Sequence, residues 1–305
     1  MEDRVITILL CYNTPYENLI NILENILNQT YPIYKLLIWD NASSNKIEGF
    51  LSKKGFLNNP KIIYIKSEKN LGAGGGFASA MDYVDKNFNG NYGWIWLIED
   101  DVNPDKDCLE KLLLYKNVSN ILIPRRKFLG GEILEDEIIL TLSTMKSSNL
   151  NNVGFKNNKK FVCVQFHPFE GLLINKNLIK KIGYPPSENF YFHDDTIYTL
   201  RAWLYDNPIL INNAFLLVLK NKEAKKNLSP KNIYYMNRNL FLVKDFLIKN
   251  NLLNKKDVLI FNLLFVWRFL KYSLASIFKF KSLKALYLVF RAFYDGINKK
   301  FGKAF

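Results

Sequence analysis

The sequence predicts an α/β fold, a mainly parallel sheet flanked by helices, because short aliphatic runs alternate with segments of helical periodicity. The runs expected to form strands are residues 5–10, 36–39, 61–65 and 94–98. Runs that are apolar throughout are typical of strands buried on both faces. Alternation of such strands with helices gives a parallel sheet whose crossovers are right-handed.

Two segments between these strands are expected to be helical. Residues 14–17, Thr-Pro-Tyr-Glu, are typical of a capping box with proline at the first helical position. The helix that follows would present one apolar face, formed by Leu19, Ile20, Leu23, Ile26 and Leu27. Residues 171–182 also have a helical pattern, and the polar stretch 147–160 is expected to be a loop or hairpin.

The formal charge of +14 is concentrated at one end of the 305-residue chain. Residues 1–225 hold 26 Lys+Arg and 25 Asp+Glu, whereas residues 226–305 hold 16 Lys+Arg and 3 Asp+Glu. We therefore expect two parts: a nearly neutral domain at 1–228 and a basic helical region at 229–305. Basic residues interleaved with aromatic ones over 271–303 are typical of an interfacial membrane helix that seeks anionic lipid, although lysines facing water would give the same pattern.

Three cysteines, an odd number without metal-type spacing, argue against a disulfide framework and favour a reducing compartment. The N-terminal residues lack the basic start and cleavage site of a signal peptide. The longest uncharged apolar stretch, 258–267, is too short to cross a bilayer and ends at Arg268. We expect a cytoplasmic protein, at most peripheral on the inner face of the cell membrane.

Three adjacent carboxylates follow the apolar run at 94–98. Glu99, Asp100 and Asp101 would lie at the carboxyl end of a strand, where open α/β sheets bind ligands. Clustered acids raise each other's pKa values unless a cation lies among them, and Mg²⁺ or Mn²⁺ takes carboxylate and phosphate oxygens. This pattern predicts a metal–diphosphate site; the alternatives are an acidic loop in water or the N-terminal acids of a helix starting near Pro104.

Two further segments lie at predicted strand ends. Asp40 follows the second strand, where its carboxylate can accept a hydrogen bond from a nucleobase or ribose, or simply form an Asx turn. Residues 70–76, Asn-Leu-Gly-Ala-Gly-Gly-Gly, precede a helix expected over 74–84. Small residues at a helix N-terminus allow close approach of an anionic ligand. The glycines match neither the dinucleotide fingerprint nor the P-loop.

A second acid pair, Asp194 and Asp195, follows aromatic residues. Partial desolvation there raises the pKa and suits a general base, while a plain helix N-cap is the structural alternative. His193 is a weaker metal or substrate candidate. Arg238, within Tyr-Tyr-Met-Asn-Arg-Asn, has the planar fork that clamps phosphate, unless the segment is an ordinary amphipathic helix start.

The order of these motifs resembles that of the family 2 glycosyltransferases, the inverting GT-A type, and most closely the branch with galactofuranosyl- and rhamnosyltransferases. The resemblance covers roughly residues 1–240 and rests on VITILLCYN, IWDNAS, NLGAGGGFASAM, WLIEDDV, GLLINKNLIKKIGYPPSENFYFHDDTIYTLR and YYMNRN. It implies a GT-A nucleotide-diphospho-sugar transferase fold. It also implies transfer of a sugar from a UDP- or dTDP-sugar to a hydroxyl of a glycan or lipid-linked glycan, in cell-surface polysaccharide synthesis.

The resemblance also implies roles for matching residues. Cys11, Asn13 and Asp40 would border the base, while Asn70, Gly72 and Gly74 would lie along the donor. Glu99 would face ribose or metal, Asp100 the sugar, and Asp101 the Mn²⁺ or Mg²⁺ ion. Asp195 would be the general base beside Asp194. Acceptor contacts are assigned to Phe169, Glu170 and His193, and phosphate contacts to Arg238 and Lys220.

Two departures from the family pattern concern the metal. The first acid of the triplet is Glu99, and no histidine stands before the Tyr-Tyr element, where Lys220 is the nearby cation. Two rival functions remain. A nucleotidyltransferase would place its glycine loop beside the first strand, and a nucleic-acid-binding protein acting through the basic region would leave both acid clusters unexplained. We expect no nucleic-acid partner, and the sequence leaves the oligomeric state open.

Overall fold

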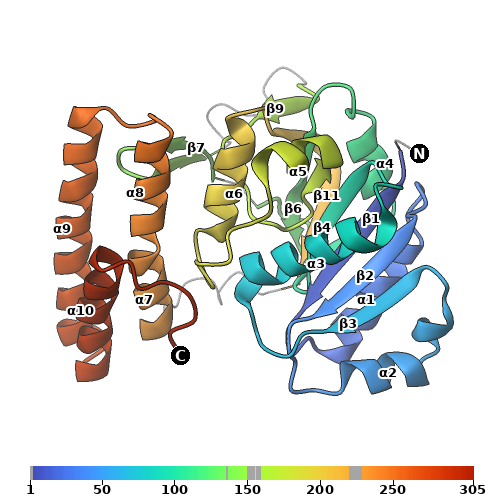
Figure 1. Ribbon diagram of the computed structural model, residues 1–305, viewed down its shortest axis with the longest axis horizontal. Helices are drawn as coiled ribbons and strands as arrows, with labels where there is room; N and C mark the ends of the chain where they lie inside the picture. Colours follow the sequence, from blue (N-terminus) through green and yellow to red (C-terminus); the bar gives the residue numbers. More distant parts are fainter. Residues whose placement is uncertain (1–2, 135–136, 150–154, 156–158, 220–228) are drawn as a thin grey trace.

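The computed structural model describes the chain except residues 1–2, 135–136, 150–154, 156–158 and 220–228. An α/β body built on one curled sheet carries a stack of helices, α7 to α10, at one end (Figure 1). The α/β class of fold expected from the sequence, with a helical C-terminal region, is confirmed. The expected boundary at 228/229 stays a prediction.

The sheet has the strand order β3-β2-β1-β4-β10-β6-β11-β5, with β9 paired to β11. The four strands expected from the sequence are present and pair in parallel. The second half is mixed, because β10 runs antiparallel between β4 and β6, and β5 and β9 run antiparallel to β11. The parallel prediction therefore holds for only part of the sheet. The strands are β1 Val5–Cys11, β2 Lys35–Asp40, β3 Ile62–Lys66, β4 Trp94–Glu99, β5 Val102–Pro104, β6 Ile121–Phe128, β9 Phe161–Cys163, β10 Leu173–Asn175 and β11 Ile209–Val218.

Helices cover both faces of the sheet. They are α1 Tyr16–Leu27, α2 Ile47–Lys53, α3 Gly72–Phe88, α4 Cys108–Leu113, α5 Lys176–Ile182 and α6 Asp194–Trp203, with a short 3₁₀ turn at Phe56–Asn58. A hairpin of β7 (Glu137–Thr141) and β8 (Lys146–Asn149) extends beside the body. Of the loop or hairpin expected over 147–160, residues 147–149 belong to β8 of this hairpin, and most of the remaining residues lie outside the described part of the chain.

Two local predictions are wrong. The capping box at the start of α1 does not form, because the Thr14 hydroxyl donates to Asp100 rather than capping the helix. The helix expected over 171–182 starts only at Lys176, where the side chain of Asn175 accepts from the N–H of Asn177. The apolar residues before it form β10, buried between two strands.

The continuous apolar runs are explained by two apolar layers, one on each face of the sheet. Alternate strand residues such as Leu9, Ile38 and Trp96 pack on the α1 and α4 side. Their neighbours, such as Ile8 and Leu97, pack on the side of α3, α5 and α6. Because both faces are covered, the charged residues of β1 to β4 and of the loops that follow them lie at the strand ends, where the sheet opens to solvent.

The helical region contains α7 Pro230–Arg238, α8 Leu240–Lys249, α9 Lys255–Phe278 and α10 Leu283–Ile297. It is fixed to the body through a core shared with α6: Ile197 and Leu200 pack with Leu240 and Val243 of α8 and with Phe261 of α9. The start of α6 carries the second acid pair, so these helices support that site from behind.

Within the described residues α9 is long and apolar enough, by length and composition, to cross a membrane. This corrects the expectation that no helix qualifies. That expectation counted only uncharged runs, whereas a helix tolerates Arg268 and Lys271 within an otherwise apolar stretch. Length and composition alone do not make α9 a membrane span, because its inner face packs on α8 and α10.

Candidate active site

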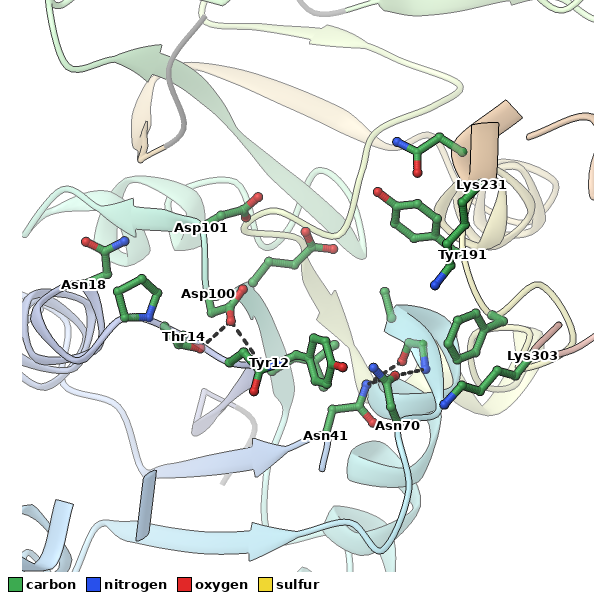
Figure 2. Close-up of a pocket in the computed structure, with 18 of the residues that line it drawn as sticks. Tyr12, Thr14, Asn18, Asn41, Asn70, Asp100, Asp101, Tyr191, Lys231 and Lys303 are labelled. Carbon is green, nitrogen blue, oxygen red and sulfur yellow. Dashed lines mark hydrogen bonds between the residues drawn. The ribbon is translucent and has the colours of Figure 1, made fainter. Parts of the chain in front are cut away.

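A cavity of about 680 Å³ opens at the carboxyl ends of β1 and β4 (Figure 2). Its floor is the acid triplet and the loop after β1, one side is the start of α3, and another side comes from the helical region. The polar residues that line it include Tyr12, Asn13, Thr14, Asn41, Asn70, Glu99, Asp100, Asp101, Tyr191, Lys231 and Lys303. The cavity therefore lies where open α/β sheets bind ligands.

The three acids of the triplet have different surroundings. Asp100 accepts hydrogen bonds from the backbone N–H of Tyr12 (2.9 Å) and from the hydroxyl of Thr14. It thereby ties the loop after β1 to the end of β4. The structure gives Asp100 an anchoring role at the cavity floor and leaves Glu99 and Asp101 as the acids that approach another carboxylate.

That carboxylate belongs to Glu170. One oxygen from each of Glu99, Asp101 and Glu170 lies within 4.8 Å of the others. Burial, and then the neighbouring Asp101 and Glu170, raise the pKa of Glu99 well above its usual range. Arg126 forms an ion pair with Glu170 and offsets part of this repulsion. An all-oxygen, anionic donor set of this kind fits a hard divalent cation such as Mg²⁺ or Mn²⁺.

The second acid pair lies in the first turn of α6. Asp194 is buried and accepts a 2.6 Å hydrogen bond from the N–H of Gly74. Asp195 accepts from the N–H (2.6 Å) and hydroxyl (3.2 Å) of Thr196. Burial, and then the charge of Asp194, raise the pKa of Asp195 to about 7. A carboxyl group that titrates near neutrality is suited to accept a proton during a reaction.

The two acid clusters lie in one electrostatic neighbourhood. Asp194 and Asp195 both raise the pKa of Glu99, and Glu170 raises the pKa of Asp195. The acids at the end of β4 and those at the start of α6 are therefore close enough to interact electrostatically, whereas only Glu99, Asp100 and Asp101 among them line the cavity described above. This proximity is what the sequence leads us to expect of two acid clusters that serve one site.

The glycine loop brings α3 against the segment that leads into α6. A Cβ on Gly72 would lie 1.8 Å from the carbonyl oxygen of Phe190, and Gly72 has a φ of +76°. A Cβ on Gly74 would lie 2.4 Å from the carbonyl oxygen of Pro186. Gly72 and Asn70 line the cavity, whereas Gly74 does not; both glycines are buried. These glycines are required first for backbone packing and only then for ligand access.

Two residues assigned to the base lie behind the cavity wall. The buried carboxylate of Asp40 accepts from the N–H of Ser43 (2.7 Å) and the hydroxyl of Tyr64 (2.6 Å), the Asx-turn alternative. Ser43 in turn accepts from the N–H of Asn13 (2.9 Å), which does line the cavity. Cys11 is fully buried in β1, and burial, then Asp100, raise the pKa of its thiol. Direct contact of Asp40 or Cys11 with a ligand is not supported.

The acceptor assignments also need correction. Phe169 is core, packed between Phe77 and Tyr198 at ring distances of 5.1 and 5.8 Å. Glu170 belongs to the candidate metal group described above. His193 precedes α6 with a φ of +65°, and burial, then Arg268 of α9, lower its pKa to about 4. A neutral histidine facing the helical region is a packing residue rather than a cavity residue.

Of the two phosphate assignments, the structure contradicts that of Arg238 and does not test that of Lys220. Arg238 is only 1 % exposed and donates to the carbonyl oxygens of Asn189 (3.1 Å) and Gly302 (2.8 Å) and to Oδ1 of Asn239 (2.8 Å). Its guanidinium therefore holds backbone segments together and does not reach a ligand. Lys220 lies outside the described residues.

The profile of glycosyl transferase family 2 matches residues 7–167, more than half of the chain. The chain belongs to this family. The match ends at His167, so it includes β1 to β4 and the acid triplet but not Glu170 or the second acid pair. No curated protein matches this glycosyltransferase.

Solved structures share the fold of this glycosyltransferase at low sequence identity. S. aureus TarS 1-349 has a TM-score of 0.62 at 17% identity, over 97% of this chain and 80% of that one. The same protein in complex with UDP-GlcNAc has a TM-score of 0.64 at 15% identity, over 97% and 81%. GalNAc-T7 with UDP, GalNAc and Mn²⁺ has a TM-score of 0.59 at 11% identity, over 77% and 47%.

Sequence reasoning missed several site residues of this glycosyltransferase. Glu170 was expected only to contact the acceptor. Its place beside Glu99 is set by a tertiary contact, the hydrogen bond from the Gly171 N–H to the Leu97 carbonyl oxygen (2.9 Å), which no sequence pattern reveals. Lys231 and Lys303 line the cavity from the helical region, and no motif marks them. Lys303 belongs to the segment expected to face a membrane, and for this residue that expectation is corrected.

Proposed function

We propose that this glycosyltransferase moves a sugar from a nucleoside-diphosphate donor to a hydroxyl group with inversion at the anomeric carbon. The observation that carries the proposal is the group of Glu99, Asp101 and Glu170, whose carboxylate oxygens lie within 4.8 Å of one another, together with the electrostatic interaction of Asp195 with Glu99 and Glu170. Membership of the family supports it, as do the fold relatives solved with UDP-GlcNAc and with UDP and Mn²⁺.

In the proposed reaction Asp195 accepts the proton of the acceptor hydroxyl while that oxygen attacks the anomeric carbon. The bond between this carbon and the diphosphate oxygen breaks, and the nucleoside diphosphate leaves. Glu99, Asp101 and Glu170 would hold Mn²⁺ or Mg²⁺, which supplies Lewis-acid stabilisation of the departing diphosphate. Asp100 fixes the floor beneath the donor, and Asp194 fixes the glycine loop beside it.

The donor proposed is a UDP- or dTDP-sugar, with Asn13 and Asn70 among the polar contacts on the cavity wall. The order of motifs supports a place in the branch with galactofuranosyl- and rhamnosyltransferases. The acceptor proposed is a glycan or lipid-linked glycan of cell-surface polysaccharide synthesis, with manganese or magnesium as cofactor.

We also propose a cytoplasmic, peripheral membrane location, because α9 carries a second apolar face. Its inner face is buried through Phe261, Phe265 and Tyr272, yet the opposite face remains at least half exposed along the whole helix. Large side chains recur there with helical spacing: Leu259, Leu263, Val266, Trp267, Leu270, Leu274, Ile277 and Phe278. An exposed helix face on which large apolar side chains predominate, here interrupted by Asn262 and Lys271, is typical of contact with another apolar phase.

Charge favours lipid as that phase. Residues 226–305 carry a net charge of +13, so pairing this face with a second copy would bring like charges together, whereas anionic lipid would be complementary. α10 adds exposed Leu283, Tyr287 and Phe290, and Phe290 packs edge-on against Phe269 of α9 at 4.9 Å. The surface proposed here therefore begins earlier in the chain than residue 271.

The proposed activity is tested by thermal-shift screening of nucleotide-sugars with and without Mn²⁺, followed by an assay for release of the nucleoside diphosphate. Stabilisation by a UDP- or dTDP-sugar, with release of UDP or dTDP, is the expected result. Release of pyrophosphate from a nucleoside triphosphate would favour a nucleotidyltransferase. Salt-dependent RNA binding without any nucleotide-sugar effect would favour the nucleic-acid-binding rival.

A further inference from the structure

We propose that Lys303 and Lys231, both from the helical region, supply the positive charge that binds the donor's diphosphate. The basic segment 299–305, called the pocket strap below, is then part of the donor site. This inference rests on the proposed function only for the class of ligand, a nucleoside diphosphate. It adds residues that lie beyond the matched family region.

Both lysines line the cavity, and in Figure 2 both extend into it from the side opposite Asp100 and Asp101. Lys231 lies in the first turn of α7. The ammonium of Lys303 lies 5.7 Å from the ring of Phe190, whose carbonyl oxygen abuts Gly72. Lys303 also lines the neighbouring hollow beside Asn70, so it stands over the glycine loop.

The electrostatics of the cavity call for such cations. Glu99, Asp100 and Asp101 line it and would repel a diphosphate, and a single divalent ion offsets only part of that charge. Among the lining residues that the structure describes, Lys231 and Lys303 are the side chains with a positive charge. Lysine is well suited to this role, because its compact ammonium binds phosphate as a point charge.

The pocket strap is fixed in place rather than loosely attached. The N–H of Gly302 donates to the carbonyl oxygen of Glu188 (2.7 Å), and its own carbonyl oxygen accepts from Arg238 (2.8 Å). The N–H of Ala304 donates to the hydroxyl of Tyr235 (2.9 Å), and the ring of Phe305 packs on that of Tyr234 at 5.1 Å. Arg238 is thus a positioning residue, which holds the strap that carries Lys303.

The test compares Lys303→Gln and Lys231→Gln with wild type by titration calorimetry of UDP, dTDP and uridine in the presence of Mn²⁺. Each substitution should weaken binding of the preferred diphosphate by about tenfold or more, the range for hydrogen bonds to charged groups, and leave uridine affinity unchanged. Lys300→Gln is the matched control, because Lys300 is an exposed lysine of the same strap that does not line the cavity. Diphosphate affinity within twofold of wild type in Lys303→Gln would overturn the inference.

A second pair of variants separates positioning from general loss of structure. Arg238→Lys removes the planar fork, whereas Gly302→Ala disturbs only the strap backbone, because Gly302 has a φ of +89° and no atom lies within 4 Å of an added Cβ. Both should lose diphosphate affinity, and neither should add to the loss in Lys303→Gln, because coupled residues are not additive. Fully additive losses would overturn the positioning role.

The outcomes distinguish this inference from the proposed function. A wild-type protein that binds neither UDP nor dTDP would overturn both. A wild-type protein that binds one of them, with binding indifferent to Lys303 and Lys231, would overturn the inference and leave the proposed function standing.

Discussion

The backbone N–H of Gly74 lies 2.6 Å from Oδ2 of Asp194, so the start of α3 is bonded to the start of α6. The contact joins the glycine loop to the second acid pair across 120 residues of sequence. It is possible only because residue 74 has no side chain, since a Cβ there would lie 2.9 Å from that of Asp194. The two motifs are one structural unit.

Gly74→Ala is therefore expected to destabilise the protein by about 2 kcal/mol or more, because the new Cβ meets backbone that is held in place. Urea unfolding measures the loss. The control is Gly49→Ala in α2, where no atom lies within 4 Å of the added Cβ and a gain of up to about 1 kcal/mol is expected. Equal stability of the two variants would contradict the close packing described here.

Asp195→Asn should lower the transfer rate by about 10²- to 10⁴-fold, because the amide cannot accept the proton of the acceptor hydroxyl. Affinity for the nucleotide donor should change little. A steady-state assay together with calorimetry checks both quantities, and Asp3→Asn, at an exposed ion pair with Lys116, is the control. Normal turnover by Asp195→Asn would remove Asp195 from the proposed role.

The pH profile follows from the same carboxyl group. Since the pKa of Asp195 is raised to about 7 by burial and by Asp194, the group is protonated below that pH and kcat/KM should fall there. The raised pKa also means that ionisation opposes folding, and this penalty grows as pH rises from about 4 toward 7. The Asp195→Asn variant should therefore be more stable than wild type at pH 8, and most of this difference should be lost at pH 5. Thermal unfolding of both proteins at the two pH values measures the difference.

Removal of the divalent cation should abolish transfer, and the carboxylates of Glu99, Asp101 and Glu170 should determine the affinity for that cation. Asp101→Ala and Glu170→Gln are each expected to weaken Mn²⁺ binding by about tenfold or more in the presence of nucleotide, because each removes a charged oxygen ligand. Calorimetric titration of Mn²⁺ measures this. Full activity after chelation, or unchanged Mn²⁺ affinity in both variants, would mean that the group is not a metal site.

The outer face of α9 gives a membrane prediction. The double variant Leu263→Glu/Leu270→Glu should reduce co-sedimentation with anionic liposomes severalfold. Both leucine side chains are exposed in the free protein and leave water only when the helix contacts lipid, so charged replacements remove this gain. Leu114→Glu is the control, since Leu114 is 70% exposed at the end of α4. Unchanged pelleting, or a shift from dimer to monomer in the variant, would point to a second copy as the partner instead.

The sequence by itself determined the elements whose side-chain pattern is local. The runs at 5–10 and 94–98 are apolar with the single exception of Thr7, so burial on both faces was expected before any partner was known. Glu99–Asp101 were predicted as site residues because they follow such a strand. Asp194 and Asp195 were predicted as site residues because they follow aromatic residues. β10 was mistaken for helix, because three residues before a real helix carry no period of their own.

Tertiary structure decided which of these groups share a space and which are used elsewhere. The approach of Glu170 to Glu99 depends on pairing between distant strands, and no local pattern encodes it. The positions of Arg238 and Lys303 differ from the sequence expectation for the same reason: burial among backbone carbonyls occupies the arginine, and the strap that it holds brings the lysine to the cavity. The sequence shows which side chains can bind or react, whereas the tertiary structure decides which of them reach the cavity.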